Sequence, residues 1–292
     1  MRRSKWAGWN GWILPASILC FIIALIPWLI MIYNSFFNLS YTKIGTGQFV
    51  GLDNYRRAFE DPSFLTSFWI TMKILLIALP VEFLLGLALA ILVARHVKMR
   101  KFVVPILTIP MVIAPAVVGL IWNLNLNPNF GPMGIFLRNL GFSSDGLLAN
   151  TTTALYTIIA IDIWQWTPFM FLLFLSGLVG QPKEPLEAAQ VDGATAWQTF
   201  KRVSVPALKP IFIVGFLLRF TDVYKLFDTI WTTTGGGPGM STEALSVFGY
   251  RVNFGYWHIG YGSAVVMLIF IISYLASLVF FHTVVPPEKK IN

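Results

Sequence analysis

Cysteine, histidine and charge are all scarce in this chain. Its 292 residues include one cysteine, Cys20, and three histidines, and only 12% are Asp, Glu, Lys or Arg. A single thiol cannot form an internal disulfide, so cysteine usage does not indicate a redox compartment. His96, His258 and His282 share no metal-ligand spacing, and we therefore expect no metal site. No convergent set of histidines and carboxylates is present either, which argues against a membrane-embedded enzyme.

The low charge and the high apolar content exclude an ordinary soluble protein. Hydrophobic residues make up 56% of the chain, and soluble domains carry about 25% charged residues. Several apolar runs approach or exceed the roughly 20 residues that cross a bilayer as a helix. The sequence therefore predicts an all-α membrane protein with a single domain over residues 1–292. Its six expected spans are residues 12–33, 68–94, 102–122, 154–179, 211–231 and 261–284.

The net charge of +8 does not indicate nucleic-acid binding, because the basic residues cluster beside the spans and there set the topology. One side of the membrane collects Arg2, Arg3, Lys5, Arg95, Lys98, Arg100, Lys101, Lys183, Lys201, Arg202, Lys209, Lys289 and Lys290. The other side collects Lys43, Arg56, Arg57, Arg138 and Arg251. This imbalance predicts that both termini and the segment 181–209 are cytoplasmic. The first apolar run is too long for a signal peptide, so we expect it to be retained.

The ionisable residues inside the spans are candidates for function, because a charge at membrane depth usually faces the bundle interior or a water-filled cavity. In the fifth span, Asp222, Lys225 and Asp228 are spaced three apart, and Arg219 precedes Asp222 by three. This spacing predicts one stripe on a helix face. Two interpretations remain open: the stripe lines a solute site, or it is an internal ladder of ion pairs.

Other spans carry fewer polar candidates. In the fourth span, Asp162 and Gln165 share a face, and Trp166 is placed to stack on the ring of a solute or to pack in the bundle. Glu82 in the second span either pairs with a neighbouring helix or lines a pathway. Asn123, near the outer end of the third span, is a candidate for lining an entrance.

A polar segment interrupts the apolar pattern between the fourth and fifth spans. Leu186 to Gln190 are good helix formers, and Gly193 interrupts them, which predicts a bend between two short helices. Glu187-Ala188-Ala189 is followed by Gly193 and then by Val203-x-Val205-Pro206. This spacing resembles the cytoplasmic EAA loop of permease subunits of bacterial ATP-binding-cassette importers, with Val in place of the usual Ile and Leu.

A second stretch resembles the carbohydrate-uptake branch of these permeases. It contains Phe227-Asp228-x-Ile230-Trp231, the run Gly236-Gly237-Pro238 and, further on, Tyr261-Gly262-Ser263-Ala264. The resemblance covers essentially the whole chain and is nearest to subunits of maltose-type and glycerol-phosphate-type systems. It implies a location in the bacterial inner membrane, surrounded by lipid.

The resemblance also implies the partners. They are a second, homologous permease subunit, two copies of a cytoplasmic ATPase that bind ATP and Mg, and an extracytoplasmic solute-binding protein. This chain has no phosphate-binding Gly-x-x-x-x-Gly-Lys-Ser/Thr loop, so we expect no cofactor and no ATP hydrolysis of its own. The loop at 181–209 is then expected to be the coupling element. Its candidate docking residues are Glu187, Ala188, Ala189, Gly193, Trp197, Phe200 and Pro206.

Two questions stay open at the level of sequence. Acidic solutes, including sugar phosphates and sulfonated sugars, fit if Arg219 or Lys225 faces the cavity, and neutral solutes fit if Asp222 and Asp228 dominate. A permease for a non-sugar solute would carry the same loop, whereas a secondary transporter would also carry buried charges but would need no docking hairpin.

Overall fold

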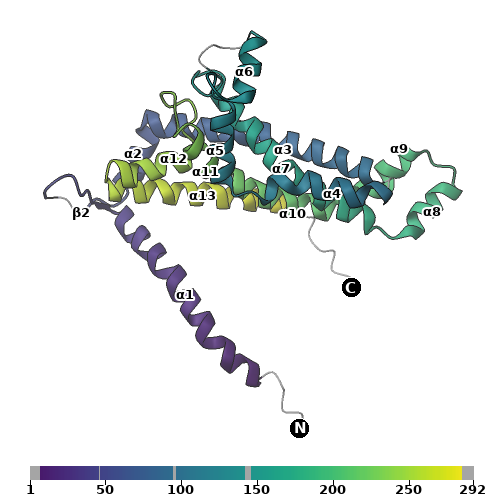
Figure 1. Ribbon diagram of the computed structural model, residues 1–292. Coiled ribbons are helices and arrows are strands. Elements are labelled where there is room, and N and C mark those ends of the chain that lie inside the picture. The colour runs from purple at the N-terminus through teal and green to yellow at the C-terminus, as the bar shows by residue number, and fades with distance from the viewer. Residues whose placement is uncertain (1–6, 46, 95–96, 142–145, 285–292) are drawn as a thin grey trace. The chain divides into compact units, whose positions relative to one another are not determined.

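A computed structural model describes residues 7–45, 47–94, 97–141 and 146–284. Within these ranges the chain is helical apart from one pair of two-residue strands and the connecting loops (Figure 1). Of the basic residues expected on the cytoplasmic side, Arg95 and those of both termini lie outside the described ranges. The contacts divide the chain into two compact units, which are considered separately below.

The first unit contains the N-terminal helix and the turn elements that follow it. It consists of described residues within 1–64 and 249–271. Its elements are α1 (Ala7–Ser35), β1 (Phe37–Asn38), β2 (Gln48–Phe49), α2 (Asp53–Glu60), η2 (Arg251–Gly255), and parts of α3, α12 and α13. The strands pair antiparallel, with Phe37 opposite Phe49. The side-chain amide of Asn54 donates to the carbonyls of Ser35 and Phe37 at 2.9 and 3.0 Å, and this satisfies backbone groups at the end of α1.

The second unit contains the long helices that carry the candidate site. It consists of described residues within 65–248 and 272–292. Its elements are α3 (Pro62–Ala94), α4 (Val97–Val112), α5 (Pro115–Asn125), α6 (Pro132–Asn139), α7 (Ala154–Val179), α8 (Lys183–Val191), α9 (Ala196–Thr199), η1 (Phe200–Ser204), α10 (Val205–Tyr224), α11 (Asp228–Thr233), α12 (Leu245–Tyr250) and α13 (Ile259–Val284), of which α3, α12 and α13 continue from the first unit. Figure 1 shows α8 and α9 beyond one end of α3, α7 and α10.

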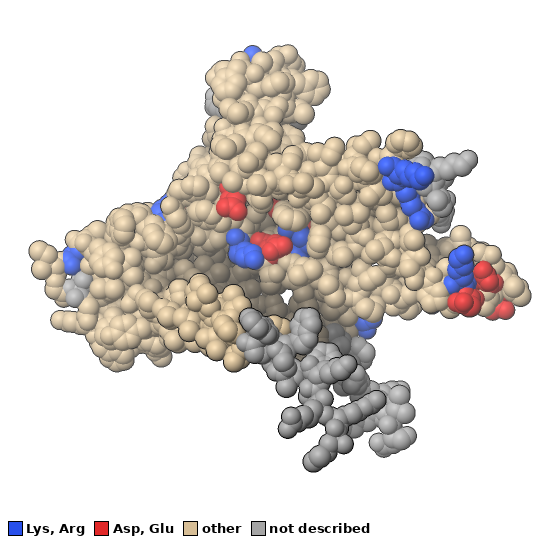
Figure 2. Space-filling model, turned by 60° about the horizontal axis from the view of Figure 1, so that its bottom comes forward, with Lys and Arg blue, Asp and Glu red and all other residues tan. Residues whose placement is uncertain are grey.

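The described residues contain five helices that are long and apolar enough to cross a membrane, or six if one bent pair counts as a single span. The helix α7 coincides with the span expected at 154–179. The expected spans 12–33, 68–94 and 261–284 fall within α1, α3 and α13. Charged side chains are sparse over the face drawn in Figure 2 and gather in a few small groups.

The third expected span, residues 102–122, is broken rather than continuous. The helices α4 and α5 meet at an angle of 92°. Pro115 favours a break at this point, since its ring disfavours helical geometry in the preceding residue. Ala114 has φ −58° and ψ 136°, which is extended backbone, and α5 begins at Pro115. The span predicted at residues 102–122 is therefore a bent pair of helices.

The fifth expected span, residues 211–231, also differs. The helix α10 begins earlier, at Val205, and it continues directly from α9 and η1. It ends at Tyr224, and a short non-helical stretch separates it from α11. The hydroxyl of Ser246 donates to the carbonyl of Leu226, which satisfies an acceptor released by the break. Asp222, Lys225 and Asp228 therefore do not share one uninterrupted helix face, and that prediction was wrong.

The core of the second unit lies where α3 and α7 pack closely. Ile74 and Ala78 on α3 and Ile158 and Phe171 on α7 are fully buried. Gly86 sits at the contact, where an added Cβ would lie 2.6 Å from Cβ of Met170 and 2.9 Å from the backbone nitrogen of Phe171. Only glycine permits this approach, as is common where membrane helices pack.

Candidate functional site

A buried cluster of three charged residues ties together α3, α7 and α10. Nε and Nη2 of Arg219 donate to the two carboxylate oxygens of Glu82 at 2.8 and 2.7 Å. The same Nη2 also donates to Oδ2 of Asp162 at 2.8 Å. The three side chains are at most 1% exposed. Charges at membrane depth must be paired in this way to be tolerated, so Glu82 pairs with a neighbouring helix, one of the two roles that its position suggested.

The pairing of Arg219 departs from its sequence spacing. The position three before Asp222 suggested neutralisation within one helix, but Arg219 instead bonds carboxylates from two other helices. The ring of Trp166 covers the guanidinium at 4.9 Å from its centroid, a favourable cation–π geometry. Oδ1 of Asp162 has no hydrogen-bond partner among the described residues. One guanidinium thus faces two carboxylates, and the cluster has more acceptors than donors.

A cavity of about 280 Å³ lies beside this cluster, at the break between α10 and α11. It is lined by Pro115, Trp166, Arg219, Asp222, Lys225, Leu226, Phe227 and Asp228. Because the chain leaves the helix after Tyr224, Asp228 reaches the same cavity as Asp222 although the two do not share a helix face. Discontinuous helices line polar cavities in many transporters.

The charges at the cavity are only loosely paired. Nζ of Lys225 lies 3.4 Å from Oδ1 of Asp222, and the two side chains are 69% and 42% exposed. Exposed pairs of this kind contribute little stability. Asp228 forms no ion pair with any described basic residue. Carboxylates that are not committed to a structural bond are available as acceptors for solute hydroxyls.

Two predicted lining residues lie elsewhere. The amide of Gln165, which is fully buried, donates to the carbonyl of Ile113 at 3.0 Å, inside the bend between α4 and α5. The amide of Asn123 on α5 donates to the carbonyl of Thr233 at the end of α11. Both side chains bond backbone carbonyls at helix ends and are not among the residues that line the cavity. Their placement supports a structural role for these two residues.

The polar segment forms a helical hairpin at the end of the bundle. The helices α8 and α9 flank a bend at Gly193, whose φ of +71° lies in the left-handed region. The sequence predicts this bend, since glycine adopts positive φ without a steric penalty. Thr195 and Gln198 form a capping box, a signal that was readable in the sequence and was missed. At the base of the hairpin, Gln181 and Ser204 exchange hydrogen bonds at 3.1 and 3.2 Å.

The surface of the hairpin includes two large apolar side chains that are exposed. Val191 is 87% exposed and Trp197 is 68% exposed, and no residue of α8 or α9 is buried. Among the predicted docking residues, Glu187, Ala188, Gly193 and Pro206 are also exposed. Ala189 and Phe200 are half-buried, and the ring of Phe200 lies 5.8 Å from that of Trp197.

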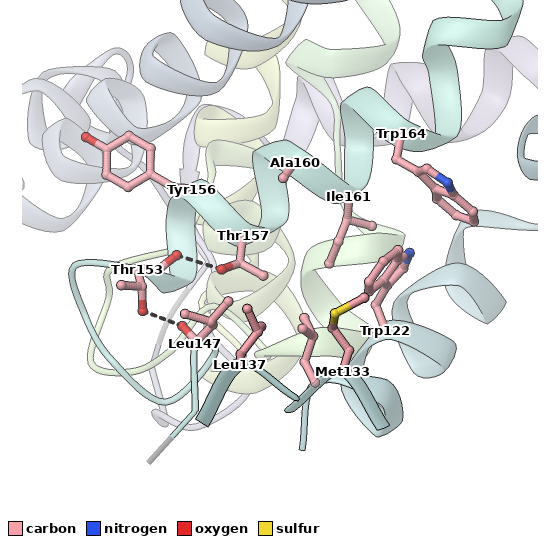
Figure 3. A pocket seen from close by; sticks show the side chains of 11 residues that line it. Trp122, Met133, Leu137, Leu147, Thr153, Tyr156, Thr157, Ala160, Ile161 and Trp164 are labelled. Atoms are coloured by element: carbon pink, nitrogen blue, oxygen red, sulfur yellow. Dashed lines mark hydrogen bonds between the residues drawn. The ribbon is translucent and has the colours of Figure 1, made fainter. Parts of the chain in front are cut away.

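A second cavity, of about 450 Å³, is unsuited to a sugar (Figure 3). Its walls are Trp122, Leu126, Met133, Leu137, Leu147, Thr153, Tyr156, Thr157, Ala160, Ile161 and Trp164. Two of the hydroxyls are already used, since Thr153 donates to the carbonyl of Leu147 at 2.6 Å and Thr157 to that of Thr153 at 2.9 Å. The cavity beside Arg219 is therefore the better candidate for a hydroxylated solute.

The described residues contain no group of three or more His, Cys, Asp or Glu side chains suited to a metal ion. Within that part of the chain, the candidate functions therefore rest on two features. These are the charged cavity between α7, α10 and α11 and the hairpin of α8 and α9.

Comparison with known proteins gives a consistent result. Residues 83–290 match the family model described as "Binding-protein-dependent transport system inner membrane component". The trehalose/maltose transport system permease protein MalF of Thermococcus litoralis is 35% identical over 232 residues, which are 79% of this chain and 78% of that protein. The sulfoquinovosyl glycerol transport system permease protein SmoG of Agrobacterium fabrum is 33% identical over 270 residues, 92% of this chain and 88% of that protein.

A solved structure has the same fold. It is the crystal structure of a bacterial alginate ABC transporter in complex with an alginate pentasaccharide-bound periplasmic protein. One of its chains superposes with a TM-score of 0.77 at 22% identity, covering 97% of both chains. At that identity the likeness concerns the fold.

Proposed function

Because this chain belongs to the family of binding-protein-dependent transport system inner membrane components, we propose that it is the translocation subunit of an ATP-driven importer for a carbohydrate or polyol. Relatives named for trehalose/maltose and sulfoquinovosyl glycerol transport support the solute class. The cavity beside Arg219 supports it too, because carboxylate acceptors and an aromatic ring suit a hydroxylated solute.

The observation that carries the proposal is an unbroken helical path from the hairpin to the cavity. Helical residues run without a gap from Ala196 through η1 to Tyr224, where the cavity begins. A helix of that length spans about 43 Å at 1.5 Å per residue. A displacement of α9 therefore also moves Arg219 and Asp222, because all three belong to the same helical segment. Rigid-body movement of this kind is one of the usual forms of conformational switching.

The hairpin is the docking element for a separate ATPase. Trp197 and Val191 supply apolar contacts, Phe200 lies next to Trp197, and Glu187 offers a charge for a basic partner residue. Ala188, Ala189 and Gly193 permit a close backbone approach, and Pro206 lies at the start of α10. Two copies of the ATPase bind ATP and Mg, and this chain contributes no hydrolytic site.

The assembly contains a second, homologous permease subunit and an extracytoplasmic solute-binding protein. The bent pair of α4 and α5 counts as one crossing, which makes six spans with both termini and the hairpin in the cytoplasm. Closure of the ATPase dimer moves the hairpin and shifts the bundle between outward- and inward-facing states. Such coupling requires that ATP and solute each bind one of the two states more tightly than the other.

Two substitutions at the hairpin test this function. Gly193→Pro cannot adopt φ +71°, since proline fixes φ near −65°, and Glu187→Lys reverses the docking charge. Both variants should abolish uptake and leave solute capture by the binding protein intact. Gly193→Asn is the matched control, because asparagine tolerates the left-handed region and no neighbouring atom lies within 4 Å of an added Cβ. Normal uptake by the Pro and Lys variants, or uptake in vesicles without any ATPase, would refute the proposal.

A further inference from the structure

The charge balance around the cavity beside Arg219 bears on which solutes it admits. Four carboxylates line the cavity or bond a residue that lines it, namely Glu82, Asp162, Asp222 and Asp228. Two cations, Arg219 and Lys225, face them. Carboxyl groups therefore outnumber cations around the cavity by four to two.

Arg219 is not free to act as an anion receptor. Its Nη2 lies 2.7 Å from Oε1 of Glu82 on α3 and 2.8 Å from Oδ2 of Asp162 on α7. These two carboxylates offset the charge of the guanidinium. Both carboxylates are fully buried, so they cannot turn away to water. Arg219 lines the cavity and can donate N–H hydrogen bonds there. Because the two carboxylates offset its charge, it does not attract an anion as a lone guanidinium would.

Lys225 cannot reverse the balance. Its ammonium already lies 3.4 Å from Asp222, and Asp228 lies on the same cavity without a described cation of its own. A bound anion would have to compete with Asp222 for Lys225 while approaching the charge of Asp228. Like charges brought close together repel each other.

We propose, building on the function proposed above, that this chain's half of the pathway is selective for uncharged sugars or polyols and against acidic ones. Asp222 and Asp228 accept hydrogen bonds from the solute hydroxyls, and Arg219 donates to a ring or glycosidic oxygen. The relatives' names include both kinds of solute, so the assignment rests on the cavity and not on the resemblance.

The test uses the assembled importer with its binding protein and ATPase, and matched pairs of labelled solutes. The uncharged probes are maltose and trehalose, and the acidic probes are maltobionate and trehalose 6-phosphate. Wild-type importer should accumulate at least one uncharged probe and neither acidic one. Uptake of an acidic probe in preference to its uncharged counterpart would overturn the proposal.

Charge-removing variants provide a second measurement that does not depend on which probe is preferred. Asp222→Asn and Asp228→Asn should each lower kcat/KM for the uncharged solute by roughly tenfold, because each loses a charge-assisted hydrogen bond. The same variants should raise the residual uptake of acidic probes. Arg56→Gln, on the exposed surface of α2 in the other unit, is the control and should change neither. Faster uptake of an uncharged probe by the Asn variants would contradict the inference.

These outcomes separate the inference from the function on which it rests. If an assembled complex with an active ATPase accumulates neither kind of probe, the carbohydrate assignment itself fails, and the charge selectivity fails with it. If acidic probes are taken up and uncharged ones are not, the proposed importer function is supported and only the inferred charge selectivity is refuted.

Discussion

Replacing Arg219 by methionine should destabilise the helical bundle strongly. The substitution removes three hydrogen bonds of 2.7 to 2.8 Å and leaves Glu82 and Asp162 without a cation. Both carboxylates are 0% exposed, so water cannot compensate for the loss. Removing one partner of a buried ion pair typically costs about 3–5 kcal/mol, because the remaining charge is left uncompensated. At about 1.4 kcal/mol per tenfold change, the ratio of folded to unfolded protein should fall by about 100- to 4,000-fold.

A companion set of variants separates the charge from the packing. Arg219→Lys keeps the charge but loses the planar fork that bonds both oxygens of Glu82, so it should be intermediate. The triple variant Arg219→Met, Glu82→Gln, Asp162→Asn removes all three charges and should recover most of the lost stability, because no buried charge is then unpaired. Arg56→Met is the matched control. The side chains of Arg56 and Glu60 in this ion pair are 77% and 62% exposed, and no loss of stability is expected.

The assay is unfolding of the purified complex in detergent, followed by heat and by denaturant, with the folded fraction scored by size-exclusion chromatography. The account requires the single Arg219→Met variant to be the least stable and the triple variant to lie near wild type. Equal stability of Arg219→Met and Arg56→Met would refute the claim that the cluster ties α3, α7 and α10 together. So would a triple variant that is less stable than the single one.

Two further predictions follow from the described contacts. Gln165→Leu leaves the carbonyl at the bend between α4 and α5 without its donor, and it should lower stability by about 1–3 kcal/mol, whereas Gln165→Glu, measured with its carboxyl ionised, should be worse because it adds a second acceptor. Burial, together with the charges of Arg57 and Lys43, lowers the pKa of His258. Folding therefore favours the neutral imidazole, so thermal stability should rise as pH increases through about 6.5. His258→Gln should remove this dependence, and an unchanged pH profile in that variant would contradict the argument.

The sequence predicted the long helices well because their signal is local. The run at 154–179 is apolar throughout and ends at Gly180, and α7 has these bounds. Gly193 marked the bend in the hairpin because a positive φ favours glycine. The prolines at 110 and 115 were visible as well, but proline inside a membrane helix is compatible with either a continuous or a broken helix. The angle of 92° between α4 and α5 therefore depends on tertiary contacts, such as the bond from Gln165.

The charged cavity was predicted only in part. The spacing of charged residues identified Asp222, Lys225 and Asp228 as candidate site residues, and all three line the cavity. Their spacing also suggested an uninterrupted helix, and the break after Tyr224 was missed because no glycine or proline marks it. The pairing of Arg219 with Glu82 and Asp162 joins residues 137 and 57 positions apart. Spacing within one helix cannot reveal such a contact, and the nearer Asp222 was the wrong partner.

Cross-linking at position 197 tests the proposed docking role of the hairpin most directly. Cys20 is the chain's one cysteine, so Cys20→Ser combined with Trp197→Cys places a single thiol on α9. Leu52→Cys in the Cys20→Ser background is the control, since Leu52 is equally exposed at 68% but lies before α2, in the other unit. In the assembled importer, a short bifunctional maleimide-amine reagent should link position 197 to the ATPase, in a yield that changes with ATP, and should not link position 52. The docking account would be contradicted if position 197 formed no link and reacted equally fast with a soluble maleimide in the presence and absence of the ATPase.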